Sequence, residues 1–356
     1  MRALSPPLAP GSQGRMNTVP ERVVILHGVV PADAPADEQD VLIQAEQVAQ
    51  ALQALGYQVA TLPLALDLET ARRQLLRLRP VLVFNLVETI AGNGRLSQLG
   101  PALLEALAIP YTGTLQTGIF LSSNKLLAKQ WLLAGGIPTP AWLSSLQEPL
   151  REAGLWIVKS VWEDASFGLD DHALVSTPLE LAYTLAERRS RLGGEWFAEA
   201  YIDGREFNLS LLAGADGLEV LPPAEIHFEG FPPGKPRIVG YAAKWDIASF
   251  EYHHTVRSFT FPESDRSLLQ QLESLALRCG ELFQIRGYGR VDLRVDAHGQ
   301  PWVLEVNANP CLAPDAGFVA AAQQAGLTLP QVIQRIIAAV PVQDGSRGER
   351  GSSLAG

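Results

Sequence analysis

The segment from Gly289 to Pro310 holds the residues whose types and spacing best suit a chemical role. Two extended runs, 290–295 and 301–307, flank the turn sequence DAHGQ and predict a β-hairpin. With a turn of about four residues, Asp292 lies opposite Glu305 on the partner strand. Two carboxylates that face each other across strands repel, so this pair needs a compensating cation.

The side-chain period of a strand decides which residues share a face with these acids. One face of the first strand carries Arg290, Asp292 and Arg294, and the matching face of the second is expected to carry Val303, Glu305 and Asn307, opposite Leu304 and Val306. Asp, Glu and Asn donate only oxygen atoms, which suits Mg²⁺ bound by few carboxylates together with substrate phosphates. No Cys or His cluster in the sequence favours zinc instead. The alternative is a solvent-exposed face on which the two arginines neutralise the acids.

The composition restricts the class of protein that carries this hairpin. The 356 residues predict two or three domains, and a content of 47% hydrophobic and 19% charged residues is typical of globular proteins. Lys and Arg number 28 against 38 Asp and Glu, a net charge of −10, which disfavours nucleic acid or an anionic membrane as a partner. Two cysteines, Cys279 and Cys311, exclude a disulfide framework and favour a reducing compartment. Without a membrane-spanning run or a signal peptide, the expected location is the cytoplasm.

Strands and helices alternate from Arg22 to about residue 113. The expected strands are 23–26, 58–62 and 81–87, and the expected helices are 38–55, 69–78 and 98–107. Such alternation predicts a parallel sheet covered by helices. No phosphate-loop lysine motif or GxGxxG sequence follows the first strand, so motifs do not support nucleotide binding by this unit. Residues 1–20 and 343–356 are rich in Pro, Gly, Ser and charge, which predicts disordered tails.

The rest of the chain predicts an α+β architecture with antiparallel strand pairs. The expected helices are 123–134, 178–192, 264–283 and 330–339, and the expected strands before the hairpin are 156–159, 195–200 and 205–212. Residues 160–170 are expected to form a polar loop, and the proline-rich stretch 222–254 is expected to be irregular. An irregular stretch of that length inside a compact chain is usually functional, so we interpret it as a lid.

Four segments, taken in order, carry a resemblance to a known family. They are TGIFLSSNKLLAKQWLLAGGIPTP (117–140), LWIVKS (155–160), AEAYIDGREF (198–207) and the hairpin with its RVD and LEVNANP sequences. Together they resemble the ATP-grasp superfamily, and specifically the D-alanine–D-alanine ligase family, over about residues 22–340. The resemblance implies an α/β fold with an N-terminal parallel-sheet domain (21–115). It also implies two α+β subdomains that clamp ATP, a central one (116–200) and a C-terminal one with a metal site (201–342).

The same resemblance implies an ATP site. Lys125 and Lys159 would contact the ATP phosphates, where a lysine offers a mobile point charge. Lys244 corresponds to the lysine of a mobile loop that reaches the γ-phosphate. The linker that hydrogen-bonds adenine corresponds to Glu199, Ala200, Tyr201 and Ile202, the carboxylate that binds the ribose hydroxyls to Glu206, and the phosphate-covering loop to 161–168 with Ser166 and Gly168.

Within the family, the hairpin residues have specific roles. Asp292, Glu305 and Asn307 match the ligands of two Mg²⁺ ions, for which Mn²⁺ can substitute, with Glu305 bridging both ions. Arg290 matches the arginine that stabilises the acyl-phosphate and the tetrahedral intermediate, a role that suits its planar, bidentate fork. The expected catalytic residues are therefore Arg290, Lys244 and Ser166.

The part of the sequence that would bind the substrates departs from the family. Cys311 replaces a glycine whose backbone helps to form the oxyanion site, and Ala313 and Ala316 stand near the expected hydroxyls, one of which holds the substrate carboxylate. Trp245 follows the lid lysine where the family usually has tyrosine. Glu38 is the nearest match to the glutamate that anchors the first substrate.

Cys311 and the histidine pair His253 and His254 are not expected to take part in the chemistry. No histidine lies near Cys311 in the sequence, so we interpret it as a packing residue rather than a nucleophile. His253 and His254 follow the expected lid and are interpreted as solvated loop residues.

An intact ATP site beside a changed substrate site predicts the family's chemistry on a different pair of substrates. We expect an ATP-dependent ligase that joins a carboxylate to an amine, or to a thiol, through an acyl-phosphate and releases ADP and phosphate. The favoured substrates are small amino-acid-like molecules or dipeptides, and D-alanine–D-alanine ligase itself is the alternative. A non-catalytic ATP-binding regulatory module is the alternative from a different class. The oligomeric state stays open, with a homodimer suggested only by analogy.

Overall fold

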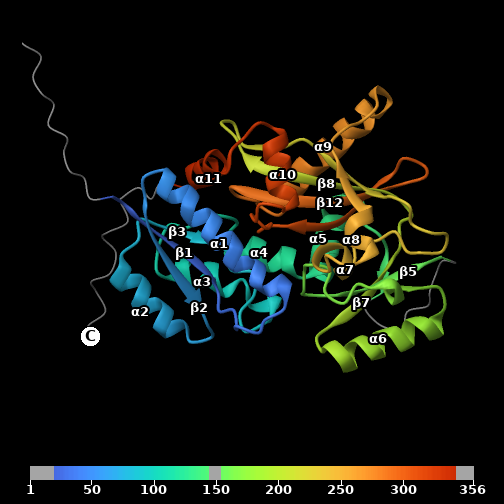
Figure 1. Cartoon of the computed structure of the whole chain (residues 1–356), viewed down its shortest axis with the longest axis horizontal. Coiled ribbons are helices and arrows are strands. Elements are labelled where there is room, and N and C mark those ends of the chain that lie inside the picture. Colours follow the sequence, from blue (N-terminus) through green and yellow to red (C-terminus); the bar gives the residue numbers. More distant parts are fainter. Residues whose placement is uncertain (1–19, 144–153, 342–356) are drawn as a thin grey trace, which may run out of the picture.

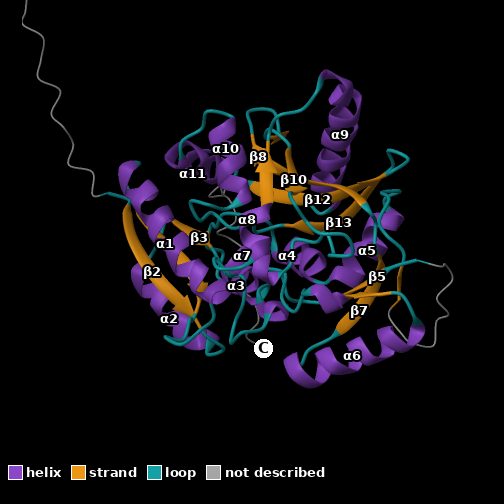
Figure 2. Ribbon diagram, turned by 45° about the vertical axis from the view of Figure 1, so that its right-hand side comes forward, coloured by secondary structure: helices purple, strands orange, loops and turns teal. Residues whose placement is uncertain are grey.

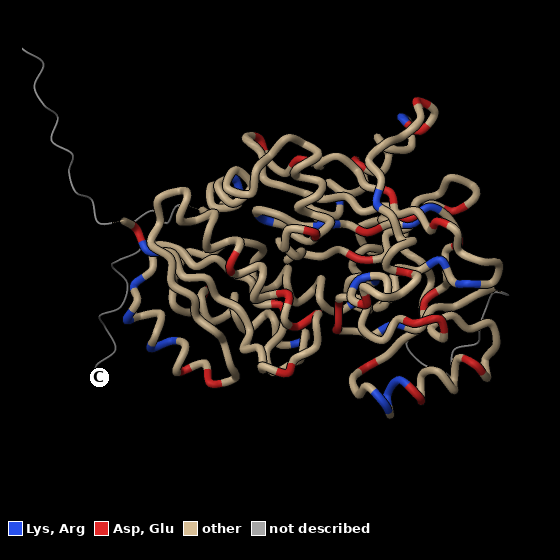
Figure 3. The backbone as a smooth tube through the Cα atoms, in the orientation of Figure 1, with Lys and Arg blue, Asp and Glu red and all other residues tan. Residues whose placement is uncertain are grey.

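The computed structural model describes residues 20–143 and 154–341, and its strands form three β-sheets (Figure 1). The tails expected at 1–20 and 343–356 lie outside the described residues, except for Pro20. Basic and acidic residues are interspersed over the fold (Figure 3). No helix in the described ranges is long and apolar enough to cross a membrane.

The first sheet is parallel, as predicted, with strand order β2-β1-β3. Its elements are β1 (Arg22–Gly28), α1 (Ala36–Ala54), β2 (Gln58–Leu64), α2 (Leu68–Leu78), β3 (Leu82–Asn85), the 3₁₀ turn η1 (Gly94–Leu96) and α3 (Leu99–Ala106). Alternate side chains of β1 are buried on opposite faces of the sheet. Val23 and Ile25 pack with α1, and Val24 and Leu26 pack with α2 and α3. The sheet is therefore covered on both faces, which explains the continuous apolar run of β1.

The second sheet is antiparallel, with strand order β4-β7-β5-β6. Its elements are β4 (Trp142–Leu143), β5 (Trp156–Ser160), η2 (Asp171–Ala173), β6 (Leu174–Val175), α6 (Pro178–Leu192) and β7 (Trp196–Ala200). A capping box starts α6, because the Thr177 hydroxyl accepts from the Glu180 backbone N–H while the Glu180 carboxylate accepts from that of Thr177. Helix α6 covers the side of β5 and β7 that faces away from the rest of the molecule (Figure 2).

The third sheet has the order β11-β10-β8-β12-β13, with β9 paired to β8. Its elements are β8 (Gly204–Ala213), β9 (Leu218–Val220), β10 (Ala224–Phe228), β11 (Thr255–Ser258), η3 (Glu263–Asp265), α9 (Arg266–Leu282), β12 (Tyr288–Asp296) and β13 (Pro301–Asn307). Helices α4 (Gln116–Ser123), α5 (Lys125–Ala134) and α9 share one apolar core with this sheet. Helices α10 (Gly317–Gln324) and α11 (Leu329–Ala338) instead join the core around α1 and β1. The predicted domain limits stay a prediction.

The expectation that 222–254 is irregular throughout is wrong. Strand β10 occupies its start, because AEIHF alternates apolar Ala224, Ile226 and Phe228 with polar residues, and the prolines lie outside these five residues. Two short helices, α7 (Tyr241–Trp245) and α8 (Phe250–His254), follow the loop 229–240. His253 and His254 therefore end a helix rather than lie in a loop.

The single helix expected over 123–134 is preceded by a separate helix. Asn124, with φ −92° and ψ 103°, is extended and ends α4, and its side chain accepts a hydrogen bond of 2.9 Å from the Leu127 backbone N–H. This cap starts α5 at Lys125, so the lysine lies in the first turn of a helix, as predicted.

The hairpin register confirms that Asp292 pairs with Glu305. A β-bulge follows, because Leu293 pairs with Val303 and Leu304 is the extra residue. Val303 is consequently buried in the core with Leu293, and the prediction that it shares a face with Glu305 is wrong.

Candidate active site

One cleft of about 1380 Å³ lies where the three sheets meet. All fourteen residues proposed from the sequence line it: Lys125, Lys159, Ser166, Gly168, Glu199, Ala200, Tyr201, Ile202, Glu206, Lys244, Arg290, Asp292, Glu305 and Asn307. Residues that are up to 182 positions apart in the chain are thus brought together around one space.

Arg290 bridges the facing carboxylates of the hairpin. Its Nε and Nη2 atoms donate to Asp292 Oδ1 and Oδ2 at 2.7 and 2.8 Å, and Nη2 lies 3.8 Å from Glu305 Oε1. Burial opposes the charge of Arg290, but Asp292 and Glu305 outweigh it and raise its pKa. Asn208, which the sequence analysis missed, donates from Nδ2 to Asp292 Oδ1 at 2.8 Å.

The second arginine of this face binds a different acid. Arg294 donates from Nε and Nη2 to Glu206 Oε2 at 3.0 and 2.7 Å, and from Nη1 to the Ile202 carbonyl at 2.9 Å. Its guanidinium lies 4.9 Å from the centre of the Tyr201 ring. Of the two hairpin arginines, Arg294 therefore fixes Glu206 and the adjacent linker, while Arg290 is the one that contacts the hairpin acids. The alternative of a solvent-exposed face is wrong, since Asp292 and Arg294 are buried.

Glu199 joins two lysines in the wall of the cleft. Its carboxylate forms ion pairs with Lys159 and with Lys129, whose Nζ lies 2.6 Å from Oε2. Lys129 also donates to the Thr139 hydroxyl at 2.8 Å. Burial would raise the pKa of Glu199, but the two lysines lower it to about 2. The resemblance implies an adenine-linker role for Glu199, and nothing in the sequence singles out Lys129.

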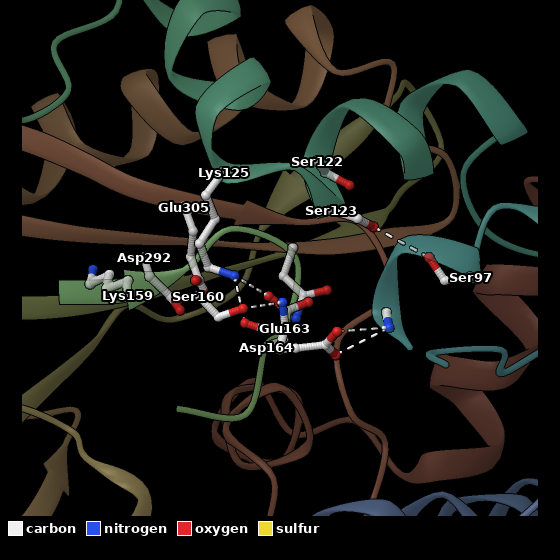
Figure 4. Close-up of polar contacts among 12 residues, drawn as sticks. Ser97, Ser122, Ser123, Lys125, Lys159, Ser160, Glu163, Asp164, Asp292 and Glu305 are labelled. Carbon is white, nitrogen blue, oxygen red and sulfur yellow. Dashed lines mark hydrogen bonds and ion pairs between the residues drawn. The ribbon is translucent and has the colours of Figure 1, made fainter. Parts of the chain in front are cut away.

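Lys125 extends from the start of α5 to the loop after β5 (Figure 4). Its Nζ donates to the Glu163 carbonyl and to Asp164 Oδ1, both at 2.8 Å. Burial opposes the charge of Lys125, but Asp164 and Glu305 outweigh it and raise its pKa. The Glu163 carboxylate accepts from the Gly94 backbone N–H at 3.1 Å, which links this loop to the first sheet's unit.

The loop 161–168 is bound to the expected lid. Ser166 Oγ donates to the Val239 carbonyl at 2.7 Å, and Trp245 Nε1 donates to the Ala165 carbonyl at 3.1 Å. Trp245, which departs from the family pattern, thus attaches α7 to the loop 161–168. Lys244, beside it in α7, is open to the cleft yet surrounded by protein, and this burial together with the nearby Arg290 cation lowers its pKa.

Gly168 lies in a left-handed conformation with φ +67°, and a Cβ there would lie 2.4 Å from Trp196 Cη2. We expect Gly168→Ala to lower the free energy of unfolding by about 2–4 kcal/mol, from the strained φ and the overpacking. Denaturant titration measures it. The control is Gly194→Ala, which has φ +71° but no atom within 4 Å of the added Cβ. Equal losses in both variants would mean that the Trp196 contact is unimportant.

Another part of the wall carries acids without a basic partner among the described residues. Cys311 Sγ donates to Asp40 Oδ2 at 2.9 Å, and Gln44 Nε2 donates to Glu88 Oε1 at 2.9 Å and to Asp40 Oδ2 at 3.2 Å. Burial raises the pKa of Glu88 to about 7. Burial and these acids raise the pKa of the Cys311 thiol, which disfavours a nucleophilic thiolate. Glu38 lines the cleft as well.

The raised pKa of Glu88 makes stability depend on pH. Because its pKa is higher in the folded than in the unfolded chain, its contribution is present below about pH 4.5 and is lost as the pH rises through about 7. We expect Glu88→Gln, without substrates, to be more stable than the wild type at pH 8 by about 1–3 kcal/mol relative to their difference at pH 4. Melting temperatures at both pH values measure this. A difference that does not change with pH would contradict the expectation.

The hairpin supplies a small set of oxygen donors for a metal. Within residues 20–143 and 154–341, no group of three or more His, Cys, Asp or Glu side chains is arranged to hold an ion. Asp292 and Glu305 offer carboxylates, and Asn307 Oδ1 also accepts from the Asn309 backbone N–H at 2.9 Å. Such a set fits Mg²⁺ when phosphate oxygens and water complete the coordination shell.

Known proteins resemble this chain in sequence and in structure. The family model for the D-ala D-ala ligase C-terminus matches residues 150–338. A Sinorhizobium fredii protein named uncharacterized protein y4sG is 33% identical, over 72% of this chain and 73% of that protein. The D-alanine–D-alanine ligase of Gloeobacter violaceus is 31% identical, over 89% of this chain and 98% of that protein. The structure of the Bacillus anthracis D-alanine–D-alanine ligase complexed with ATP is 20% identical and covers 90% of this chain and 97% of its own, with a TM-score of 0.69, so the two share a fold.

Proposed function

The chain belongs to the D-alanine–D-alanine ligase family of ATP-grasp enzymes, and on this premise we propose that it joins two amino-acid-like substrates other than a pair of D-alanines. It is an ATP-dependent ligase that forms a C–N bond. The observation that carries the proposal is a contrast within one cleft. The residues expected at the ATP end all line it, whereas another part of its wall is built from Asp40, Glu88 and Cys311.

The proposed reaction has two steps. A carboxylate oxygen of the first substrate attacks the γ-phosphorus of ATP; a P–O bond forms, the bond to the β-phosphate oxygen breaks, and ADP leaves with that electron pair. The amine of the second substrate then attacks the acyl carbon; a C–N bond forms, the C–O bond to phosphate breaks, and the amine loses a proton. Mg²⁺ bound by Asp292, Glu305 and Asn307 would supply neutralisation of the phosphate charge.

We assign the phosphate-binding role to lysines that the fold already holds in place. Lys125 and Lys159 are fixed by Asp164 and Glu199, so little side-chain freedom is lost when they bind phosphate. Lys244 approaches from the lid and would reach the transferred group. Arg290, whose fork lies flat against Asp292, would present its other donor atoms to the oxyanion of the tetrahedral intermediate.

The nucleoside end is assigned to the linker and its acid. Glu206, held by Arg294, would accept from the ribose hydroxyls, and the backbone of 199–202 would meet the base. The two hydrogen bonds between the loop 161–168 and the 239–245 segment support a closed cover over the phosphates. Such a cover matters because water would hydrolyse an acyl-phosphate.

Phosphate release from Mg²⁺-ATP with a panel of amino acids and small peptides, D-alanine included, tests the proposal, with products identified by mass spectrometry. Condensation of a pair other than two D-alanines supports it. If the product is D-alanyl-D-alanine, the second candidate, D-alanine–D-alanine ligase, is favoured. That candidate is supported by the matches to relatives of that name over nearly their whole length. ATP binding without turnover across the panel would favour a regulatory module. A cytoplasmic location agrees with the use of ATP, and a homodimer stays a prediction.

A further inference from the structure

The guanidinium of Arg294 lies between the nucleoside end of the cleft and the expected lid (222–254). Strands β8 and β12 pair with Glu206 directly opposite Arg294, and Arg294 also donates to the Ile202 carbonyl of the linker at 2.9 Å. A third contact crosses to the lid, because Nη2 donates to the Arg237 carbonyl as well as to Glu206. One buried side chain therefore holds the acid, the linker and the lid.

The contact between Arg294 and Glu206 leaves one carboxylate oxygen for a ligand. Both Nε and Nη2 donate to Oε2, at 3.0 and 2.7 Å. Neither bond uses Oε1, and Glu206 lines the cleft. Burial opposes the charge of Arg294, but Glu206 outweighs it and raises its pKa, so the guanidinium stays charged. The carboxylate is thus held by one oxygen, and the other can accept from a ligand in the cleft.

The Arg237 carbonyl belongs to a part of the lid, residues 237–241, that is attached to the nucleoside end. Tyr201, whose ring lies 4.9 Å from the Arg294 guanidinium, donates from its hydroxyl to the same carbonyl at 3.2 Å. The next side chain, Ile238, is buried against strand β5 and lines the cleft. The position of this segment therefore depends on groups that also shape the nucleoside end.

We propose that Arg294 is a positioning residue that couples recognition of the ribose to closure of the lid over the phosphates. The inference rests on the proposed function, because it presupposes that Glu206 binds the ribose hydroxyls and that the lid excludes water. A hydroxyl bound at Oε1 fixes the carboxylate, which fixes the guanidinium that holds the Arg237 carbonyl. Residues 237–241 lead into α7, which carries Lys244, so the same chain of contacts positions the lysine proposed to reach the transferred group.

The test measures ribose recognition and lid closure separately, with the substrates that the panel identifies. Affinity for ATP relative to dideoxy-ATP, the analogue that lacks both ribose hydroxyls, measures the first. The ratio of phosphate released to peptide formed measures the second, because water that reaches the acyl-phosphate releases phosphate without forming peptide. The wild type should bind dideoxy-ATP about 10–100-fold more weakly than ATP, the worth of hydrogen bonds to a charged group.

Coupling predicts a result that a purely structural role does not. At saturating nucleotide, the wild type should release about one phosphate per peptide with ATP and about two or more with dideoxy-ATP. Arg294→Met should give the same raised ratio with both nucleotides, because the link between the ribose and the lid is lost. Arg294→Lys should give intermediate ratios, since it keeps the charge but lacks the fork that reaches Glu206 and the Arg237 carbonyl together.

Controls identify the possible failures. Arg266→Met removes an ion-paired arginine on the surface, outside the cleft, and should match the wild type in both measurements. A wild-type ratio that does not depend on the nucleotide would overturn the inference, and this comparison applies even if Arg294→Met does not fold. A folded Arg294→Met whose ratio still depends on the nucleotide would overturn it as well. Equal affinity of the wild type for the two nucleotides, or no peptide from any substrate pair, would instead count against the proposed function.

Discussion

Glu305→Gln is expected to lower the turnover of the ligase by about 100-fold or more, the scale of removing one preorganised electrostatic contact to the transferring group. Glu305 is directly opposite Asp292, and Arg290 bonds closely to Asp292 while standing 3.8 Å from Glu305. The variant keeps the shape of the side chain and removes one of the two carboxylates offered to Mg²⁺. The Mg²⁺ concentration for half-maximal activity should therefore rise as well.

Stability distinguishes this effect from unfolding. Because the two carboxylates repel, neutralising one should leave the melting temperature within a few degrees of the wild type. Asp292→Asn should behave in the same way toward Mg²⁺-nucleotide, although it also weakens the contact with Arg290. Glu46→Gln, on the exposed side of α1, is the matched control for the loss of one acid. Unchanged nucleotide affinity and Mg²⁺ dependence in both hairpin variants would show that the pair binds no metal.

The local sequence pattern was sufficient to predict those parts of the fold that form between segments close together in the sequence. The parallel sheet follows from alternating strands and helices, and the Asp292–Glu305 pair follows from one short turn. The bulge at Leu304 could not be foreseen, because nothing in PWVLEVN distinguishes an extra residue from a regular strand. It nevertheless decides that Val303 packs in the core while Glu305 faces the cleft.

Contacts between segments distant in the sequence could not be predicted, for a different reason. Asn208 meets Asp292 only because β8 lies beside β12, and strand order is not written in the periodicity of either strand. Cys311 and Asp40 meet across 271 positions because the segment after β13 contacts α1, so the interpretation of Cys311 as simple packing missed its polar contact. The resemblance to a family named residues of the ATP end, where this chain keeps the pattern. Where the chain departs from that pattern, as at Cys311 and Ala316, the resemblance gave no role to the residues that are present.

Glu199→Gln is expected to lower the free energy of unfolding by about 3–5 kcal/mol, because it leaves a buried cation without its partner. The side chain of Lys129 is 1% exposed, and the remaining contacts, the Thr139 hydroxyl and the Pro140 carbonyl, are neutral. Since the pKa of Glu199 is lowered to about 2, its stabilising effect is present above about pH 4.5 and is lost as the pH falls toward 2. Denaturant titrations at pH 7 and pH 3 should therefore show a smaller difference between the two proteins at the lower pH.

The double variant Lys129→Met/Glu199→Gln separates charge burial from packing. With the buried cation removed, most of the lost stability should return, because an apolar side chain replaces an unpaired charge. If stability returns but the affinity for ATP does not, Glu199 acts chiefly by holding Lys159, which is 15% exposed, at the cleft. If the double variant is as unstable as Glu199→Gln, the ion pairs are not what holds α5 against β5 and β7. The Glu199 carboxylate would then not stabilise the fold. The proposed phosphate-binding residue Lys159 would be positioned by backbone packing alone.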